Sequence, residues 1–229
     1  VVAARGDRVA WRDAERVYAA RLTRDRLTAI RGTRAPAGSH PVGFVGDGVL
    51  LERRSEEDLS GMYAVWWPGR GNLRARWRPA TGVYGAMPDG RTVVAQLPGG
   101  DAEEPCLALL DGLDHLAVLE QRCDVPLIAG SVGWVSPDGR WLVAERTVAE
   151  SILIDVSSVF GGEKPAIAEG PRPNGPGVWT DGDTVVYGAT GYLARLRLDR
   201  AAAGEPDALE RITVHGGDDQ PVLAVPRLS

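Results

Sequence analysis

Short apolar runs rich in β-branched residues recur along the 229-residue chain, and turns rich in glycine, proline and aspartate separate them. In five places a turn that contains Asp next to Gly stands between two such runs. Glycine adopts positive φ without steric cost and aspartate accepts hydrogen bonds from its own backbone, so this pattern predicts a β-hairpin. The turn aspartates are spaced by about 40 to 50 residues, and they are Asp7, Asp47, Asp89, Asp138 and Asp181.

Each hairpin continues into further strands and so forms a larger repeating unit. The second strand of each unit is predicted directly after the turn, at residues 8–11, 49–53, 92–96, 141–145 and 184–187. A third strand is predicted at 16–22, 62–67, 106–111, 151–156 and 192–198. In the last of these, leucines stand between Arg195 and Arg197 and on either side of them, as in a strand with one buried face. A weaker fourth strand is predicted at 27–31, 73–77, 116–122, 165–169 and 211–215.

Four strands per unit, with a period in the forties, are typical of a β-propeller blade. The sequence therefore predicts an all-β protein, a β-propeller of four-stranded antiparallel blades, with five blades preferred and six still open. A single domain would span residues 1–229, with blades at about 1–38, 39–81, 82–130, 131–174 and 175–219. A sandwich is the competing all-β fold, but the same turn at the same place in each unit favours the propeller. Helix formers gather only at 199–209, where Gly204 and Pro206 interrupt them, so this stretch is interpreted as a loop insertion.

The best-formed turns also resemble a known repeat. Val135-Ser-Pro-Asp-Gly-Arg-Trp-Leu-Val-Ala-Glu145 and Met87-Pro-Asp-Gly-Arg-Thr-Val-Val94 are similar to the WD40-like (PD40) repeat of TolB-like propellers, whereas the other three units lack the Pro-Asp-Gly triplet. The resemblance implies the propeller fold and a location outside the cytoplasm. It implies no activity, because the motif residues form turns and are not catalytic groups. TolB-like chains often have six blades, so residues 220–228 are expected to close the ring against the first blade or to begin a lost sixth.

Charge and composition exclude several classes of protein. The formal net charge is −5, which argues against a general nucleic-acid binder, because such a protein needs a basic surface to neutralise phosphates. No apolar run approaches the length that crosses a bilayer. Lys164 is the only lysine, so arginine supplies the other positive charges. The chain begins without methionine or a signal segment, so we expect a mature form, a trimmed chain or a domain cut from a longer membrane-anchored protein.

The two cysteines, Cys106 and Cys123, flank a stretch whose expected turn is at residues 112–115. Folding about that turn brings the two ends of the hairpin nearly opposite each other, so a cross-strand disulfide is geometrically reasonable. The usual location of the family outside the cytoplasm also favours a disulfide, and the alternative is two separately buried thiols. A metal site at these cysteines is not expected, because no further cysteine and no histidine cluster supplies ligands.

No assembled catalytic set is visible in the sequence. His40, His115 and His215 belong to none of the usual metal-binding patterns, and no phosphate-binding loop or Gly-x-Ser-x-Gly elbow occurs. We therefore predict no catalytic residue, no metal and no cofactor. In a propeller the first strand of each blade lines the central channel, and here these strands offer few of the carboxylates and histidines that hold a channel metal. Their large side chains are Phe44, Tyr84, Trp134 and Trp179.

One rim of the predicted propeller has the chemistry of a binding surface. Loops that lead to the next blade, and loops between the second and third strands, emerge on the same side. Arginine and tryptophan are frequent anchors at protein interfaces, and the residues predicted to bind are Arg34, His40, Trp67, Arg76, Trp77, Arg78 and Arg172. The acidic residues of the same rim are Glu56, Glu57, Asp58, Asp101, Glu103 and Glu104. The alternative is that these charges are simply solvated and that the tryptophans pack between blades.

These observations predict a non-enzymatic, extracytoplasmic β-propeller that serves as a platform for a protein, peptide or other ligand. We expect a monomer that binds no nucleic acid and crosses no membrane. The alternative function is a propeller hydrolase or lyase that acts on a sugar, a lactone or a peptide at the channel mouth. Its motivation is only that many propellers are enzymes, and mutation of His40 would test it.

Overall fold

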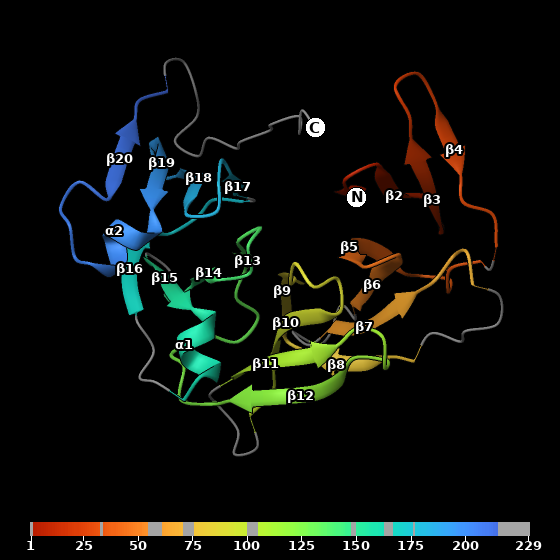
Figure 1. The fold of residues 1–229 in the computed structure, drawn as a ribbon, viewed down its shortest axis with the longest axis horizontal. Coiled ribbons are helices and arrows are strands. Elements are labelled where there is room, and N and C mark those ends of the chain that lie inside the picture. The colour runs from red at the N-terminus through yellow and green to blue at the C-terminus, as the bar shows by residue number, and fades with distance from the viewer. Residues whose placement is uncertain are drawn as a thin grey trace. The chain divides into compact units, whose positions relative to one another are not determined.

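The computed structural model describes residues 2–32, 34–54, 61–70, 76–99, 105–147, 150–162, 167–175 and 177–214. In this part of the chain the strands form five antiparallel sheets of four strands each (Figure 1). Within every sheet the strands lie side by side in chain order, so each sheet is a four-stranded meander. The predicted all-β class and the five four-stranded blades are confirmed.

The bounds of the strands follow the predicted units closely. The first sheet contains β1 (Val2–Arg5), β2 (Arg8–Asp13), β3 (Arg16–Leu22) and β4 (Leu27–Ala29). The second sheet contains β5 (His40–Val45), β6 (Gly48–Arg54), β7 (Gly61–Trp66) and β8 (Arg78–Ala80). The third sheet contains β9 (Gly82–Ala86), β10 (Thr92–Leu97), β11 (Cys106–Asp111) and β12 (Ala117–Arg122). The fourth sheet contains β13 (Gly133–Val135), β14 (Trp141–Glu145), β15 (Glu150–Asp155) and β16 (Ile167–Pro171). The fifth sheet contains β17 (Val178–Trp179), β18 (Thr184–Ala189), β19 (Tyr192–Arg197) and β20 (Leu209–Ile212).

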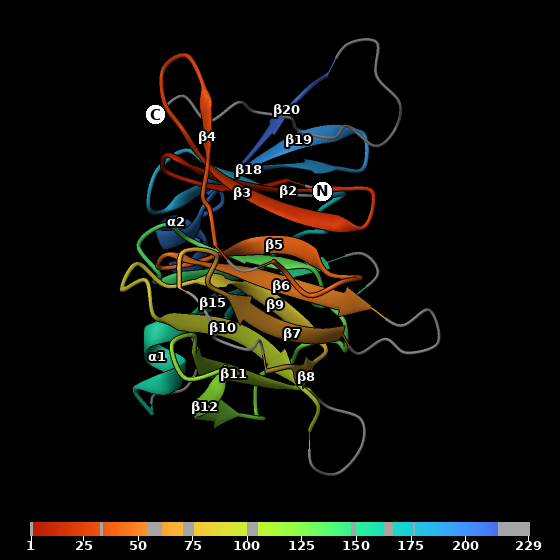
Figure 2. The same cartoon turned by 90° about the vertical axis from the view of Figure 1, so that its right-hand side faces the viewer.

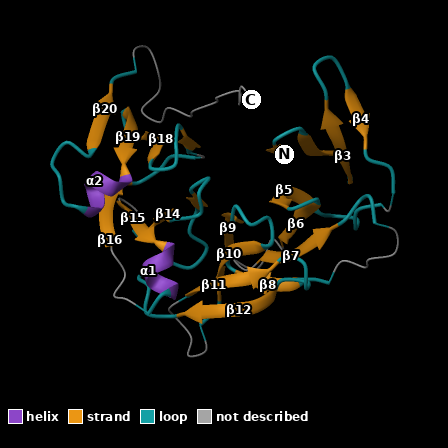
Figure 3. Ribbon diagram, viewed as in Figure 1, coloured by secondary structure: helices purple, strands orange, loops and turns teal. Residues whose placement is uncertain are grey.

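Two short helices occur among the described residues (Figure 3). The first, α1 (Val156–Phe160), follows β15 directly, because the side chain of Asp155 accepts hydrogen bonds from the first free backbone N–H groups of the helix. The second, α2 (Leu198–Ala202), begins where a loop insertion is predicted, so that prediction is wrong for the first residues of the insertion. Two consecutive alanines favour the helix, and Gly204, with a φ of +73°, turns the chain away after its end.

The fourth strands differ most from the sequence prediction. The strand predicted at 73–77 is found as β8, which begins at Arg78, and residues 73–75 lie outside the described residues. The strand predicted at 211–215 is found as β20, which begins at Leu209. A fourth strand has only one neighbour in its sheet, so fewer pairing constraints define its ends. This position at the edge also explains why β8 accommodates Pro79, which has no N–H to donate.

The repeat turns are of two kinds. In the first two sheets the loop consists of residues 6–7 and 46–47, and its glycine has a φ of +58° and +52°, respectively. In the Pro-Asp-Gly turn of the third sheet the aspartate comes first, and Asp89 accepts hydrogen bonds from the backbone N–H groups of Arg91 at 2.8 Å and Thr92 at 2.9 Å. The same Asp and Gly signal therefore specifies a hairpin in both cases, but with loops of different width.

The arginine that follows each Pro-Asp-Gly turn joins the hairpin to the third strand of its own sheet. Arg91 donates hydrogen bonds of 3.1 and 2.6 Å to the carboxylate of Asp111 at the end of β11. Arg140 contacts Asp155 at the end of β15 at 3.3 Å, and also pairs with Asp199 of α2 at 3.0 Å. These motif arginines act within the fold, where pairing with a carboxylate fixes their geometry.

By its internal contacts the chain divides into two compact units, Val1–Leu97 with Ala108–Leu119, and Pro98–Leu107 with Glu120–Ser229. In the first unit, Val17 and Ala19 of β3 belong to one apolar cluster with Phe44, Leu51 and Trp66 of the second sheet. The second sheet packs on the third through a second cluster, and Figure 2 shows β5, β6 and β7 beside β9 and β10. That cluster includes Leu50, Tyr63, Val65, Val93, Ala95 and Leu110.

The second unit is built in the same way. The fourth and fifth sheets share a cluster that contains Trp141, Val143 and Leu153 from one sheet and Tyr187 and Leu196 from the other. Trp134 of β13 and Trp179 of β17, both in first strands, pack against this cluster. Within each unit, successive sheets thus bury one face against each other, which is how propeller blades are stabilised. The assignment of residues 1–229 to one domain stays a prediction, and so does ring closure by residues 220–228, which lie outside the described residues.

Candidate binding site

A cavity of about 420 Å³ opens on the first unit. The turn between β2 and β3 contributes Glu15, the connection after β4 contributes Arg34 and Ala35, and β7 contributes Trp66. The remaining residues of the lining are Trp11, Arg16, Val17, Tyr18, Ala19, Ala29, Ile30, Gly32 and Ala37. The lining is mostly apolar and aromatic, and its charged members are one glutamate and two arginines. This composition suits the binding of an apolar side chain from a ligand whose neighbouring groups are polar.

One side of the cavity is formed by an aromatic pair. The antiparallel register of β2 and β3 places Trp11 opposite Tyr18, and their rings stack with centroids 5.6 Å apart and planes 20° apart. Tyr18 nevertheless keeps 39% of its surface exposed. A stacked but accessible ring presents a rigid apolar surface that loses little conformational entropy when a ligand covers it.

The other side of the cavity belongs to the packed core of the first unit. Val17 and Ala19 are buried at 8% and 5% exposure, and Trp66 of the second sheet is 5% exposed. The backbone N–H of Ile30 donates to the carbonyl of Ala19 at 2.9 Å, which keeps the chain after β4 close to β3. The cavity is therefore formed by residues of β2, β3, β4 and β7 together with the connection after β4, which supplies Gly32, Arg34, Ala35 and Ala37.

Polar side chains of the first and second sheets gather around His40 of β5. Arg12 contacts the imidazole ring of His40, and the register of β5 and β6 pairs His40 with Glu52. The Glu52 carboxylate accepts hydrogen bonds from the Tyr63 hydroxyl at 2.5 Å and from Arg54 at 2.8 Å. Burial, followed by the neighbouring positive charge of Arg12, lowers the pKa of His40. Burial, with the hydrogen bond to Glu52, raises the pKa of the Tyr63 hydroxyl.

These shifts keep both rings neutral near pH 7. A neutral His40 offers a partner no positive charge, and its ring is already in contact with Arg12. The Glu52 carboxylate is bonded on two sides and only 9% exposed. The Tyr63–Glu52 hydrogen bond therefore ties β7 to β6, and the Arg12–His40 contact ties β2 of the first sheet to β5.

The structure separates the other residues of the predicted rim. Trp67 is only 7% exposed, with Arg70 over its ring at 4.8 Å, and Trp77 is half-buried under Arg53 at 4.2 Å. Both tryptophans therefore leave little exposed surface for a partner. Three arginines of the predicted set, Arg76, Arg78 and Arg172, do not line the cavity. Arg76 is exposed and Arg78 is half-buried at the start of β8, whereas Arg172 belongs to the second unit and pairs with Glu145 at 3.0 Å.

Of the predicted rim residues, only Arg34 lies in the cavity. The predicted acidic rim residues lie outside the described residues. The sequence interpretation missed Trp11, Arg16, Tyr18 and Trp66. A signal for the aromatic pair existed: Trp11 and Tyr18 stand at equal distances from the turn at residues 14–15, so a hairpin there places them opposite each other.

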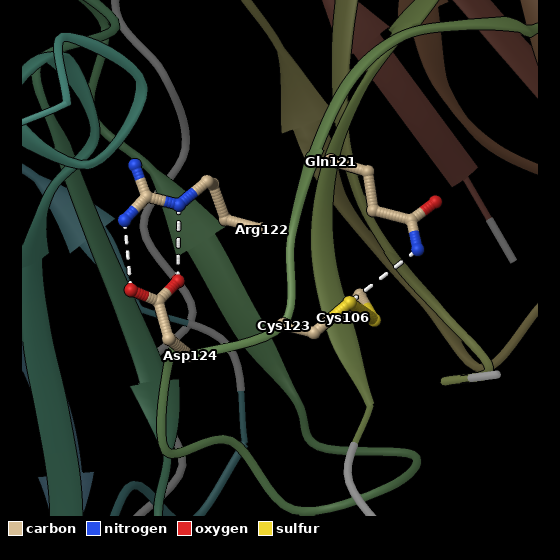
Figure 4. Close-up of a disulfide and its surroundings, with 5 residues drawn as sticks. All are labelled: Cys106, Gln121, Arg122, Cys123 and Asp124. Atoms are coloured by element: carbon tan, nitrogen blue, oxygen red, sulfur yellow. Dashed lines mark hydrogen bonds and ion pairs between the residues drawn. A yellow bond between two sulfur atoms is a disulfide. The ribbon is translucent and has the colours of Figure 1, made fainter. Parts of the chain in front are cut away.

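The predicted disulfide is present in the second unit (Figure 4). Cys106 of β11 and Cys123, just after β12, are bonded across a sequence separation of 17 residues. Cys106 is fully buried and Cys123 is exposed. Around the bridge, Gln121 donates to the Cys123 sulfur at 3.4 Å, and Arg122 forms two hydrogen bonds, of 3.0 and 2.7 Å, with the Asp124 carboxylate. The bridge thus ties the end of an outer strand to the interior of its sheet.

A smaller cavity of about 320 Å³ lies beside this bridge in the second unit. Asp124, Leu127, Ile128 and Arg146 are among its lining residues, and Arg146 also pairs with Glu169. Among the described residues, no group of three or more His, Cys, Asp or Glu side chains is placed to hold a metal ion. Nor does the described part of the chain contain a helix that is long and apolar enough to cross a membrane.

Comparison with known proteins supports the fold and no more than the fold. No known protein family and no curated protein matches the sequence. Among solved structures, the Cps50 (Swd1) β-propeller domain of Myceliophteria thermophila is similar with a TM-score of 0.60 and 10% identity, over 96% of this chain and 73% of that one. The Kuenenia stuttgartiensis hydrazine synthase is similar with a TM-score of 0.59 and 14% identity, over 93% and 73% of the two chains. The β-propeller domain of the Trilobed protease from Pyrococcus furiosus is similar with a TM-score of 0.54 and 11% identity, over 94% of this chain and 70% of that one. The chain therefore has a β-propeller fold.

Proposed function

We propose that this protein is a non-enzymatic, extracytoplasmic propeller with TolB-like repeats, and that it binds a protein or peptide partner. The observation that carries the proposal is the cavity on the first unit, where a stacked Trp11–Tyr18 pair lies open beside two arginines. Aromatic and arginine side chains in a concave apolar site are the usual anchors of protein interfaces. Arg34 of the predicted rim lines the cavity of this proposed surface, whereas His40 does not.

The disulfide supports the proposed location. Cys106 and Cys123 are bonded to each other, and structural disulfides persist in oxidising compartments, whereas cytosolic thiols are kept reduced. The compartment can be tested by trapping free thiols in cells before lysis. An extracytoplasmic protein should take up no alkylating agent, because both of its cysteines are in the bond, whereas alkylation of both would contradict the proposed location.

The binding test fills the cavity without touching the core. Ala29 lines the cavity and is exposed, so Ala29→Trp should occupy the cavity while the sheet stays folded. Ala203, an exposed residue of the second unit after α2, provides the matched control Ala203→Trp. Immobilised wild-type protein and both variants are exposed to cell-envelope extract of the source organism. We expect one protein to be retained by the wild type and by Ala203→Trp and to be lost from Ala29→Trp.

Two results would contradict the proposal. Equal retention by all three proteins would mean that binding does not use this cavity. Absence of any retained protein, together with turnover of a sugar, lactone or peptide by the purified chain, would favour the enzymatic alternative. Circular dichroism of the two variants, compared with the wild type, establishes that a loss of binding does not come from unfolding.

A further inference from the structure

Charge is distributed unevenly along this chain. Residues 16–34 contain six arginines and one acidic residue, Asp25, so this segment carries a net charge of +5. The whole chain carries −5, and the remaining residues therefore carry −10. The positive segment includes β3, β4 and the start of the connection to the second sheet, which Figure 1 draws in orange-red. A protein that is acidic overall thus has one local cationic region.

The arginines of this region are exposed to solvent. All six are exposed, and none of them forms an ion pair within the described part of the chain; they are Arg16, Arg21, Arg24, Arg26, Arg31 and Arg34. Several arginines elsewhere in the chain do form ion pairs, and Arg8, Arg91 and Arg140 each pair with an aspartate. Two of these arginines are in β3, two in the turn between β3 and β4, and two in the connection after β4. Their six exposed guanidinium groups raise the local positive potential, because their fields add over distances of about 10 Å.

Apolar side chains are exposed among these arginines. Tyr18 is 39% exposed, Leu22 is 51% exposed and Leu27 is 53% exposed. Leu22 and Leu27 are paired across β3 and β4, and Tyr18 lies further along β3 at the cavity. The cavity itself has Arg16 and Arg34 in its lining. A cationic surface is therefore continuous with a concave apolar site that can receive a side chain.

We propose that β3, β4 and the adjoining cavity bind an acidic linear segment of a partner protein, and that this segment inserts one aromatic or leucine side chain between Tyr18 and Trp66. The inference rests on the proposed binding function and names the class of its partner. The charge complementarity comes from the exposed arginines, and the anchor site comes from the cavity.

The remaining charge of the chain favours a short acidic segment over a large polyanion. A membrane surface or a nucleic acid presents phosphates over a wide area, and the −10 carried by the rest of the chain opposes its approach. A peptide of a few residues meets only the cationic region. A flat lipid surface also fills no concave site of 420 Å³, whereas a single large side chain does.

The test selects peptides directly on the folded protein, so the partner need not be identified first. A displayed library of random linear peptides is selected on the wild-type protein and counter-selected on Ala29→Trp, in which the cavity is occupied. We expect the enriched peptides to be net acidic and to share one Trp, Phe or Leu. A synthetic peptide from this set, labelled with a fluorophore, is then titrated by fluorescence polarisation at low and at physiological salt.

Variants of the protein and of the peptide test the contributions of charge and of the anchoring side chain separately. Replacement of Arg16 and Arg34 by glutamine should weaken binding of the labelled peptide by roughly 1.5- to 5-fold per arginine, and salt should also weaken the wild-type complex. The matched control is glutamine at Arg195 and Arg211, which removes two charges from the fifth sheet and should leave binding unchanged. Exchange of the peptide's acidic residues for amides, or of its anchor for serine, should each abolish most of the affinity.

The outcomes distinguish this inference from the function on which it rests. Enrichment of neutral or basic peptides that still require the open cavity would overturn the acidic segment and leave the binding function intact. Binding of phosphatidylglycerol vesicles or single-stranded DNA in place of any peptide would also overturn it. If no selected peptide distinguishes the wild type from Ala29→Trp, the inference is overturned. If, in addition, both proteins retain envelope proteins equally, the proposed function is overturned as well.

Discussion

Removal of the disulfide is the sharpest test of how this chain is stabilised. The bridge closes a loop between Cys106 and Cys123, which are separated by 17 residues. Without it the unfolded chain gains the conformational freedom of an open loop, and for a loop of this length the chain-entropy relation gives about 3 kcal/mol at 25 °C. Replacement of both cysteines by alanine should therefore lower the free energy of unfolding by about 3 kcal/mol, plus a smaller loss from the buried Cys106 sulfur.

The assay compares urea unfolding of the oxidised wild type, the reduced wild type and the double alanine variant, followed by tryptophan fluorescence. The reduced wild type keeps both sulfurs, so it isolates the effect of the bond. Because the bond lies in the second of two compact units, the unfolding curve is analysed for two transitions. We expect the reductant to shift the wild type and to leave the double variant unchanged.

The reasoning would be refuted by a difference below about 1 kcal/mol between oxidised and reduced wild type. Such a result would mean that the reduced unfolded chain already keeps the β11–β12 hairpin closed, so that the bond removes little freedom from it. Amide exchange in β12 gives a second measurement: exchange should accelerate after reduction, because this outer strand then loses its covalent link to β11 and keeps only non-covalent contacts, such as its pairing with β11 and the hydrogen bond from Arg122 to the carbonyl of Val159.

Three further predictions test the packing and the turns. Alanine at Gly112 would place a Cβ in collision with a Val45 methyl group and 2.7 Å from the carbonyl of Arg91. We therefore expect Gly112→Ala to lower the free energy of unfolding, measured in urea, by about 2 to 3 kcal/mol. Gly191→Ala, at a φ of +83° but with nothing within 4 Å, should lower it by only about 1 kcal/mol. Leu153→Ala removes a fully buried side chain from the cluster of the second unit and should cost about 2 to 5 kcal/mol, whereas Leu119→Ala, at a residue that is 53% exposed, should be nearly neutral by the same measurement. Burial alone would raise the pKa of Asp89, but hydrogen bonds from Thr92 and Arg91 outweigh it and hold the pKa below the usual 3.8. The Asp89 carboxylate therefore stabilises the fold at neutral pH, and this contribution is lost as the pH falls below 3.8 toward the lowered pKa of the folded state. The urea midpoint of Asp89→Ala should therefore fall less between pH 7 and acid pH than the midpoint of the wild type.

The repeat itself could be predicted because its information is local. A hairpin turn is specified by the glycine and aspartate within it, and a strand with one buried face by alternating residues. The fourth strands are displaced from their predicted places, as β8 and β20 show, because an outer strand is defined by a single neighbour and its own pattern is weak. The helix α1 depends on one capping side chain, Asp155, which the sequence pattern does not single out among the many aspartates of turns.

The binding surface could be predicted only in part. Arg34 is identified by its place in a connection between blades, and it does line the cavity. Trp67 and Trp77 have the right residue type in the right segments, yet the fold covers both of them, one in the core and one under Arg53. The aromatic residues that are accessible come from strands, Tyr18 above all.

The sequence alone determined the strands, the turns, the number of sheets and the closeness of Cys106 to Cys123. These features depend on residues that stand near one another in the chain, so they can be predicted without a tertiary structure. Which side chains remain open to solvent, and which of them meet at the cavity, depends on how the sheets pack. Trp11 and Trp66 both line it, although they belong to different sheets. Exposure at a blade is set by the neighbouring sheet that packs on it, and residues far apart in the chain supply that neighbour.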